Sequence, residues 1–583
     1  MRMSWLSLYR FSVAPMVLAA LMSSMPFSAV AQDSDGLPGL PDAREFLARP
    51  PAEESDSKQP VATTELEYAD QASAEEVAPA RSVLSYVNQA IFTVLFFDVS
   101  FGSIEVDDVD EYGNLLLDRD GVAGKKIVKL PFLVLFLLIG AVFFTFWYGW
   151  INIRGFRHAI DIVAGKYDKP EDTGEISHFR ALTSALSATV GLGNIAGVAI
   201  AIQLGGPGAV FWMLLAALFG MSAKFSSCVL SQLYRQKNAD GTISGGPMYY
   251  LDLGLKDMGA KWAGLGKVLA VMFALMVMGG AIGGGNMFQA NQTVEAITTA
   301  FGIESDRAPW VIGITLAVFV GAVILGGIKR IGLATSRIVP GMCGLYVLTS
   351  FIIILANWRQ LDDCIALIFR MAFGQNAFFG GMAGVMVMGI KRAAFSNEAG
   401  LGSAAIAHAA AKTDEPVREG MVAMLGPFID TIVVCLMTAL VVIITGAWND
   451  ASIPREAGVA LTTAAFGSVI PWFPYVLTVC IGLFAYSTMI SWCYYGERGW
   501  IYLLDHFGGI GLKTVIVFRL IFVAAIVVGA VNKLSDVLDF SDAMILSMAF
   551  PNIVGSAILA PRVLSKVKDY WARYKSGEMK PVK

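Results

Sequence analysis

The composition of this 583-residue chain excludes an ordinary soluble protein. Hydrophobic residues make up 56% of it and charged residues only 15%, and the mean hydropathy is +0.61. So much apolar surface requires lipid around it. The net charge of -4 gives no general basic patch, so we expect no nucleic-acid partner.

The cysteines and histidines give no sign of a metal or redox centre. The six cysteines are scattered singly without a C-x-x-C pair, and we interpret them as packing residues. The four histidines fall at segment ends and share no metal-ligand spacing. We therefore expect no metal and no cofactor beyond a coupling ion.

The amino end resembles a secreted leader followed by an acidic tail. Residues 1–31 combine arginines, a short apolar run and Ala29-Val-Ala31, which predicts a signal peptide. An uncleaved anchor is the alternative. Residues 32–128 then hold an acidic tail, an apolar stretch at 83–101 that we interpret as an interfacial helix, and an acidic insertion.

From Lys129 onward, long apolar runs alternate with short polar breaks. Residues 129–560 therefore form the expected transmembrane domain, and 561–583 a basic cytoplasmic tail. About eleven spans are predicted, near 131–153, 180–204, 208–234, 265–296, 309–327, 338–357, 376–410, 419–446, 471–496, 514–532 and 537–560.

The distribution of basic residues predicts the orientation. The loops assigned to the cytoplasm hold about two dozen Lys and Arg and the opposite loops about five, as the positive-inside rule requires. Together with the leader, this predicts a multi-pass bacterial inner-membrane protein whose N-terminus is periplasmic and whose C-terminus is cytoplasmic. A retained leader would add a span and contradict this orientation.

Two of the predicted spans are interrupted by glycine at matching places. Gly191-Leu-Gly-Asn194 in the second span recurs as Gly400-Leu-Gly-Ser403 in the seventh. Such a pair is typical of a five-plus-five inverted repeat with its site at the breaks. Unwound backbone inside a membrane must face a cavity or a ligand. Close helix packing is the alternative interpretation of each pair alone.

Ionisable residues inside predicted spans add candidates for a gate or an ion relay. Asp430 lies near the middle of its span, where an acid is a functional hypothesis by default. A structural hydrogen bond to a neighbouring helix is an equal alternative. Lys391, Arg392 and Glu398 lie in the seventh span, where they indicate a gate or a brace rather than a substrate anchor.

Polar residues on two further spans could complete a site. Asn286, Gln289 and Gln292 share one helical face, which could hold an ammonium group or bond a neighbouring helix. Thr488 lies one turn before Trp492, so a hydroxyl suited to a cation stands beside an aromatic wall suited to a small side chain.

The motifs at these positions resemble those of the alanine/glycine:cation symporter family, from about Phe179 to the end of the last span. They are Val190-Gly-Leu-Gly-Asn-Ile-Ala-Gly-Val198, Gly205-Gly-Pro-Gly208, Gly245-Gly-Pro-Met-Tyr249, Phe395-Ser-Asn-Glu-Ala-Gly-Leu-Gly-Ser403, Ile429-Asp-Thr431 and Tyr494-Tyr-Gly-Glu-Arg498. The leader, the acidic tail and the insertion depart from the shorter family pattern and stay unexplained.

The resemblance implies an all-α, leucine-transporter-like fold with one extra N-terminal span. It also implies Na⁺- or H⁺-coupled uptake of alanine or glycine. By matching position, it places substrate at Gly191, Gly193, Asn194, Phe288, Gln289, Thr488 and Trp492. It places the cation at Thr189, Val190, Ser487 and Thr488.

Two other classes of membrane protein are less well supported. An intramembrane protease would need a nucleophile or metal motif, and neither H-E-x-x-H nor G-x-S-x-G is present. A channel would need pore-lining rings, whereas paired breaks favour alternating access. No Walker-type loop is present, so we expect no ATP as a partner. The choices between Na⁺ and H⁺, and between alanine and glycine, stay open.

Overall fold

The computed structural model describes 88, 97–107, 124–238, 241–324, 327–374, 381–450, 452–453, 458–506 and 508–582. The chain divides into two compact units, Met1–Ala78 and Pro79–Lys583, and all described residues belong to the second. The predicted signal peptide and most of the predicted acidic tail therefore lie outside the described residues.

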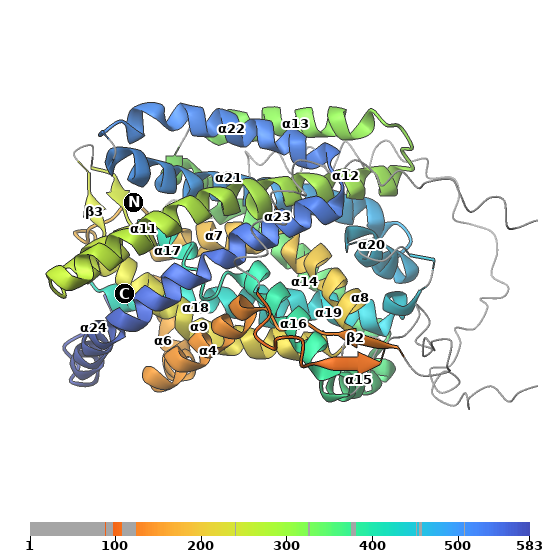
Figure 1. The fold of residues 1–583 in the computed structure, drawn as a ribbon, viewed down its shortest axis with the longest axis horizontal. Coiled ribbons are helices and arrows are strands. Elements are labelled where there is room, and N and C mark those ends of the chain that lie inside the picture. The colour runs from red at the N-terminus through yellow and green to blue at the C-terminus, as the bar shows by residue number, and fades with distance from the viewer. Residues whose placement is uncertain are drawn as a thin grey trace, which may run out of the picture. The chain divides into compact units, whose positions relative to one another are not determined.

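The second unit is built almost entirely of helices (Figure 1). Its first part contains α4 (Phe132–Trp147), α5 (Ile151–Arg154), α6 (Phe156–Val163), α7 (His178–Thr189), η2 (Gly193–Gly197), α8 (Val198–Gly205), α9 (Ala209–Leu233), α10 (Pro247–Lys256), α11 (Ala260–Ile282), η3 (Gly283–Met287), α12 (Phe288–Phe301), α13 (Ala308–Ile324) and α14 (Gly327–Ala356). Its second part contains η4 (Trp358–Gln360), α15 (Leu361–Phe373), α16 (Gly381–Asn397), α17 (Ala404–His408), α18 (Pro416–Pro427), η6 (Phe428–Cys435), α19 (Leu436–Ile444), η7 (Ala447–Asn449), α20 (Gly458–Val469), α21 (Phe473–His506), α22 (Gly511–Val531), α23 (Leu534–Ser547) and α24 (Ala549–Lys575).

Two short antiparallel strand pairs complete the described secondary structure. Strand β1 (Glu105–Asp107) pairs with β2 (Lys125–Ile127), and β3 (Gln236–Lys237) pairs with β4 (Ile243–Ser244). The first pair brackets the predicted acidic insertion.

Several helices are long and apolar enough to cross a membrane. Within the described residues there are seven such helices, or eight if α7 and the η2–α8 helix count as one bent span. The apolar helices α4, α13 and α20 are shorter. Every predicted span overlaps at least one of the observed helices, because long apolar runs are the strongest signal in such a sequence.

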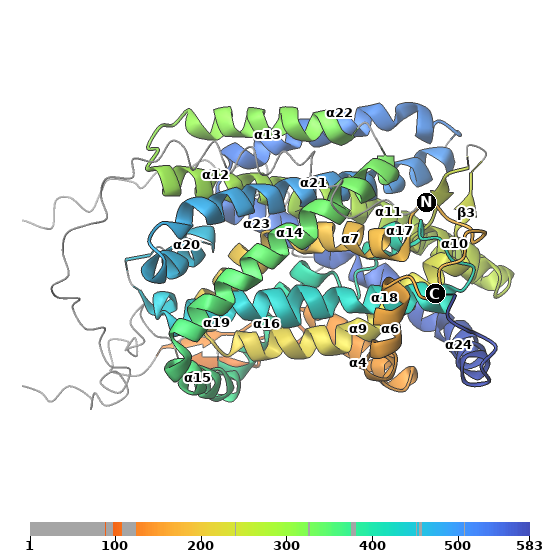
Figure 2. The same cartoon turned by 180° about the vertical axis from the view of Figure 1, so that it is seen from behind.

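The broken helix α7 and α8 lies in the interior of the bundle. Helices α13 and α22 pack together on one side of it, and α4 and α9 pack together on the other, as both views show (Figures 1 and 2). Helix α21 contacts α7, α11 and α22, so it links the broken helix to the first of these sides. Helices α7 and α21, which carry predicted site residues, therefore lie between these two pairs of packed helices.

Four described stretches differ from the structure that the sequence predicted. Residues 97–101 form a turn rather than the end of an interfacial helix, because the Asp98 carboxylate accepts backbone N–H bonds from Ser100, Gly102 and Leu130. The Ser100 hydroxyl, which donates to Asp98 Oδ1 at 2.6 Å, and these backbone bonds together lower the pKa of Asp98 to about 2.

Helices α15 and α20 occupy stretches that were predicted as polar breaks. Both are shorter than a membrane span, so a search for spanning runs does not find them. Helix α24 continues to Lys575 through Pro561, whereas the sequence predicted that the helix ends at 560 and a tail follows.

Candidate substrate and ion site

The first glycine-interrupted segment is a genuine break in a helix. Helix α7 ends at Thr189, and the chain bends by 56° before it continues as η2 and α8. The Gly191 N–H donates to Asn194 Oδ1 at 2.9 Å, and the Leu192 N–H donates to Gln289 Oε1 at 3.2 Å. Side chains therefore satisfy backbone groups that an intact helix would bond internally.

Carbonyl groups after the break are bonded by hydroxyls of neighbouring helices. Thr438 donates to the Asn194 carbonyl at 2.8 Å, and Thr462 donates to the Ile195 carbonyl at 3.3 Å. The unwound segment is thus held from α19 and α20 as well as from α12. Neither threonine was singled out from the sequence.

Helix α21 faces the last turn of α7 through a polar seam. Thr488 Oγ1 donates to the Ser187 carbonyl at 3.0 Å, and Trp492 Nε1 donates to the Ala188 carbonyl at 3.1 Å. In the other direction, Ser187 Oγ donates to the Ser487 carbonyl at 2.7 Å. Thr488 and Trp492 therefore lie on one face, as their spacing of four residues predicts.

Two serines of this seam were missed from the sequence. Ser187 bonds α21 from one side, and Ser491 Oγ donates to Ser187 Oγ at 3.0 Å. Both could have been found, because Ser491 lies four residues after Ser487 and Ser187 lies one turn before Gly191.

Most of the predicted cation residues bond within their own helix rather than across to a neighbouring one. Thr189 Oγ1 donates to the carbonyl of Ala185, within its own helix, at 3.2 Å. The Val190 N–H donates to the Leu186 carbonyl at 2.6 Å, so this residue still closes the last turn of α7. Ser487 Oγ likewise donates within its helix, to the Phe484 carbonyl at 3.0 Å. Of these three predicted hydroxyls, that of Thr488 bonds across to another helix.

The glycines of the first break allow neighbouring groups to approach the backbone closely. A Cβ atom on Gly191 would lie 2.5 Å from Thr488 Oγ1 and 3.2 Å from Gln289 Oε1. A Cβ atom on Gly193 would lie 3.3 Å from the Cα atom of Ser396, in the second broken segment. These positions therefore need glycine for space, and the two breaks lie against each other.

Aromatic side chains enclose this region. The Phe288 and Phe395 rings meet edge to face with their centroids 5.3 Å apart. Trp492 packs directly on Gly285, where a Cβ atom would lie 2.2 Å from the indole. The predicted substrate residues of α12 and α21 thus lie beside the first break.

The polar residues of η3 and α12 do not form one face toward the site. Gln289 reaches the break, and its Nε2 atom donates to the Gly284 carbonyl at 2.9 Å. Asn286 donates to the Phe522 carbonyl on α22 at 2.5 Å. Gln292 Oε1 accepts the Val459 N–H at 3.1 Å. The sequence left open whether these residues hold an ammonium group or bond neighbouring helices. Asn286 and Gln292 bond neighbouring helices, and of the three only Gln289 faces the site.

Asp430 is fully buried and bonded to both broken segments. Its Oδ1 atom accepts the Asn194 side-chain N–H at 2.7 Å. Its Oδ2 atom accepts hydroxyl bonds from Ser396 at 2.9 Å and from Thr431 at 2.8 Å. The carboxylate therefore connects the break on α7 to the break after α16.

The second break places three alternate residues in left-handed backbone conformations. Glu398, Gly400 and Gly402 have φ angles of 56°, 83° and 90°. A glutamate rarely adopts such a φ angle, and residues held in this way cluster at functional sites. The Ala399 N–H donates to Asn397 Oδ1 at 2.9 Å, and Asn552 Nδ2 donates to the Gly400 carbonyl at 2.7 Å.

Arg392 does not join Asp430 and Glu398. Its guanidinium bonds the buried Asp542 on α23, and Lys391 Nζ lies 2.7 Å from the same carboxylate. Arg392 also lies over the Phe395 ring, 5.4 Å from its centroid. The pair of cations therefore braces α16 against α23. Asp542 was missed, although an acid inside a predicted span is the signal that identified Asp430.

A third polar cluster joins the outer ends of the two broken segments. The Glu419 carboxylate on α18 bonds Nδ1 of His178, at the start of α7, and Nδ1 of His408, at the end of α17. All three side chains are buried. Histidine spacing gave no hint of this cluster, because the two rings are far apart in sequence.

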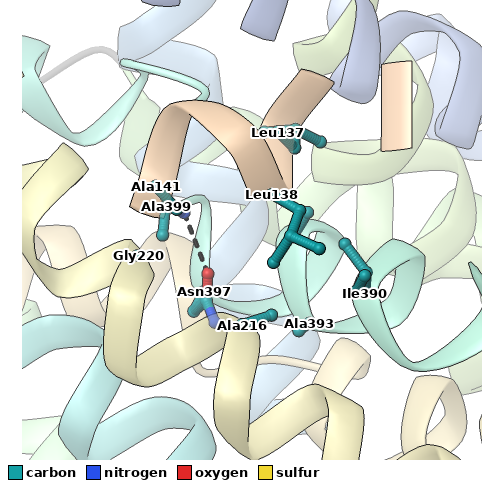
Figure 3. A pocket seen from close by; sticks show the side chains of 10 residues that line it. Leu137, Leu138, Ala141, Ala216, Gly220, Ile390, Ala393, Asn397 and Ala399 are labelled. Carbon is teal, nitrogen blue, oxygen red and sulfur yellow. Dashed lines mark hydrogen bonds between the residues drawn. The ribbon is translucent and has the colours of Figure 1, made fainter. Parts of the chain in front are cut away.

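A small cavity lies behind the second break, between α4, α9 and α16 (Figure 3). It is lined by Leu137, Leu138, Ala141, Ala216, Gly220, Ile390, Ala393, Ala394, Asn397 and Ala399. Its volume of about 20 Å³ admits a water molecule but not an amino acid. This cavity is therefore separate from the predicted substrate site.

Comparisons with known proteins place most of the chain in one family. A family model described as the sodium:alanine symporter family matches residues 121–583. The Sodium/alanine symporter AgcS of Methanococcus maripaludis is 42% identical over 441 residues, which is 76% of this chain and 94% of that protein.

Two proteins of Bacillus subtilis are also similar. A putative sodium/proton-dependent alanine carrier protein, YrbD, is 36% identical and covers 79% of this chain and 93% of its own length. A probable sodium/glutamine symporter, GlnT, is 34% identical over 79% and 91%. Among solved structures, MhsT in complex with L-phenylalanine matches with a TM-score of 0.44 and 14% identity, over 66% of this chain and 98% of that one.

Proposed function

Because the chain belongs to the sodium:alanine symporter family, we propose that it carries alanine or glycine into the cell together with Na⁺ or H⁺. It is a multi-pass membrane protein that performs cation-coupled amino-acid symport. The coupling ion is its only cofactor, and the energy comes from the ion gradient rather than ATP. The single observation that carries the finer proposal is the contact of Thr488 and Trp492 with the last turn before the first break.

The substrate would bind at the first break. The backbone N–H of Gly193 suits a carboxylate, because the start of a half-helix carries partial positive charge. The N–H of Gly191 would exchange its bond to Asn194 for one to the substrate. Asn194 and Gln289 supply amide groups that can bond the substrate. Phe288 and Trp492 would limit the side chain to a small one, since both rings already occupy the space beside the break.

The cation would bind on the other side of α7, between this helix and α21. Carbonyl groups at Thr189 and Val190 and hydroxyls of Ser487 and Thr488 are the proposed ligands. Na⁺ is a hard cation that needs oxygen ligands, which these groups supply. Ser187 and Ser491 lie in the same seam and could support the ligand helix.

The proposed architecture is a five-plus-five inverted repeat preceded by α4, with about eleven spans. The protein would lie in the bacterial inner membrane with its N-terminus periplasmic and its C-terminus cytoplasmic. Asp430 and Glu398 would act in the gate or ion relay, because both lie at the breaks. Arg392 would act in the same gate as a brace on Asp542.

Uptake of radiolabelled alanine into proteoliposomes tests this function, with Na⁺ and H⁺ gradients imposed separately. Alanine and glycine should accumulate against their own gradient only while an ion gradient is present. Unlabelled glutamine should compete weakly. Flux that equilibrates without any ion gradient would indicate a channel, and strong competition by glutamine alone would contradict a pocket for small side chains.

A matched variant localises the transport site. Gly285→Ala should abolish uptake, because the added methyl group would overlap the Trp492 indole. Gly482→Ala is its control on α21, since a Cβ atom there meets nothing within 4 Å. Equal uptake by the two variants would place the substrate elsewhere.

A further inference from the structure

Glu398 lies in the second break and has too few hydrogen-bond donors for an ionised carboxylate. Its side chain is 1% exposed. The Ser403 hydroxyl bonds its Oε2 atom, whereas Oε1 has no hydrogen-bond partner among the described residues. Buried carboxylates normally accept several bonds or pair with a cation, because the charge is costly to remove from water.

The nearby ammonium group of Lys224 does not fill this role. Lys224 is buried on α9, and its Nζ atom donates to the Asn397 carbonyl at 2.9 Å, at the C-terminal end of α16. A cation is favourable there because helix C-termini carry partial negative charge. In the described part of the chain, no salt bridge joins Lys224 to Glu398, although the two groups interact electrostatically. The same helix end disfavours an ionised Glu398.

The charges enclosed around the second break do not balance. The titratable groups that face Glu398 are Lys224 and Cys228 on α9, Asp430 on η6, and Tyr495 on α21. With the Cys228 thiol and the Tyr495 phenol neutral, the charged groups are one ammonium group and two carboxylates. If all three are ionised, one net negative charge is buried. One further positive charge is needed.

Geometry places that charge on Glu398 rather than on Asp430. Three donors from Asn194, Ser396 and Thr431 already stabilise an ionised Asp430. Glu398 offers an unpartnered oxygen instead. A metal cation at Glu398 would need several oxygen ligands, whereas among the described residues the one other unpartnered, buried side-chain oxygen that interacts with Glu398 is the hydroxyl of Tyr495. A proton needs no set of oxygen ligands, because it binds one carboxyl oxygen covalently.

We infer that Glu398 is a proton-binding site whose occupancy changes during transport. The proton neutralises the carboxyl group while the second break is closed, as it is here, and is released when the break opens to water. The left-handed φ angle of Glu398 fits a residue held in place for function rather than for stability. This inference rests on the proposed function, because it assigns a role to a residue of the proposed gate.

A ring contact links Tyr495, which faces Glu398, to the proposed substrate pocket. Tyr495 meets Trp492 edge to face with the ring centroids 5.4 Å apart, and Trp492 bonds the Ala188 carbonyl. Substrate that closes the pocket around Trp492 would therefore favour the protonated form of Glu398. By linkage, a proton on Glu398 would favour substrate binding to the same extent.

The first test measures alanine binding to the full chain in detergent at saturating Na⁺ across a pH range. If the closed state requires one proton, the dissociation constant should rise about tenfold per pH unit once the open-state carboxyl group is ionised. Glu398→Gln, which resembles the protonated form, should bind alanine with little pH dependence. Glu295→Gln is the matched control and should keep the wild-type slope. The inference is wrong if Glu398→Gln keeps that slope or if the wild type shows none.

A second measurement does not depend on the substrate. Infrared spectra of the protein in Na⁺ buffer should show the carbonyl band of a buried, protonated carboxyl group. The band should be lost in Glu398→Gln and kept in Asp430→Asn. If the band is lost only in Asp430→Asn, the proton resides on Asp430 and the assignment to Glu398 is wrong. If alanine fails to bind at any pH while this band behaves as expected, the proposed substrate is wrong and the proton site stands.

If Glu398→Gln does not fold, proton uptake by the wild-type protein still tests the inference. When alanine is added to the weakly buffered wild-type protein, the protein should take up about one proton for each alanine bound, because binding closes the site. Alanine binding without proton uptake at any pH would overturn the inference.

Discussion

Gly191→Ala adds a single methyl group at the point where the first break meets α21. Its Cβ atom would lie 2.5 Å from Thr488 Oγ1 and 3.2 Å from Gln289 Oε1, whereas favourable contacts lie near 3.5–4.0 Å. Thr488 cannot retreat without stretching its 3.0 Å bond to the Ser187 carbonyl. Overpacking of this kind costs about 1–3 kcal/mol.

Thermal unfolding in detergent and the Na⁺ dependence of uptake together measure the effect. Gly191→Ala should lower the unfolding temperature and raise the ion concentration for half-maximal uptake, since it displaces the Thr488 hydroxyl. Gly197→Ala is the control in the same broken segment, because a Cβ atom there meets nothing within 4 Å. It should behave like the wild type.

A double-mutant cycle isolates the cause. Thr488→Ala alone loses one hydrogen bond, worth about 1 kcal/mol. In the double variant with Gly191→Ala, the missing hydroxyl makes room for the new methyl group, so the combined loss of stability should be smaller than the sum. Additive losses, or equal behaviour of Gly191→Ala and Gly197→Ala, would refute the contact on which the proposed cation site rests.

Three further outcomes are expected. In uptake assays at matched protein levels, Thr488→Ala should raise the ion concentration for half-maximal uptake while Thr488→Ser stays near the wild type; unaltered ion dependence would make Thr488 a packing residue. Trp492→Ala should admit bulkier amino acids in competition experiments, because it vacates the indole volume beside the break; unchanged selectivity would place the ring outside the pocket. Arg392→Gln should destabilise the protein by about 1.5–3 kcal/mol, because the buried Asp542 carboxylate loses its guanidinium partner but keeps the ammonium group of Lys391; Asp542→Asn in the same chain should recover part of that loss, as thermal unfolding would show.

The histidine on α6 gives the stability of the protein a pH dependence. Burial lowers the pKa of His158 from 6.5 to about 4. Between these values the unfolded chain binds a proton that the folded chain excludes, so stability should fall as the pH is lowered through this window. His158→Gln should remove that part of the pH dependence of the unfolding temperature. A profile that is the same in both proteins would show that His158 does not cause it.

The sequence by itself located the long apolar helices of the transmembrane domain and the two glycine-interrupted segments, although it missed α15 and α20. Long apolar runs predict helices because a membrane leaves backbone groups no partner outside the helix. Matching glycine pairs at 191–193 and 400–402 predicted both breaks, because glycine permits close approach and left-handed backbone conformations. The face shared by Thr488 and Trp492 followed from helical spacing alone.

Only the tertiary structure decided which side chains meet across those helices. Asp430 bonds Asn194 across 236 positions of sequence, and Arg392 bonds Asp542 rather than Asp430. Helical periodicity predicts which face of a helix is polar but not which neighbour that face contacts. The unbalanced charge at Glu398 is a property of how α9, η6 and the second break pack together, and this packing depends on the three-dimensional fit of the helices.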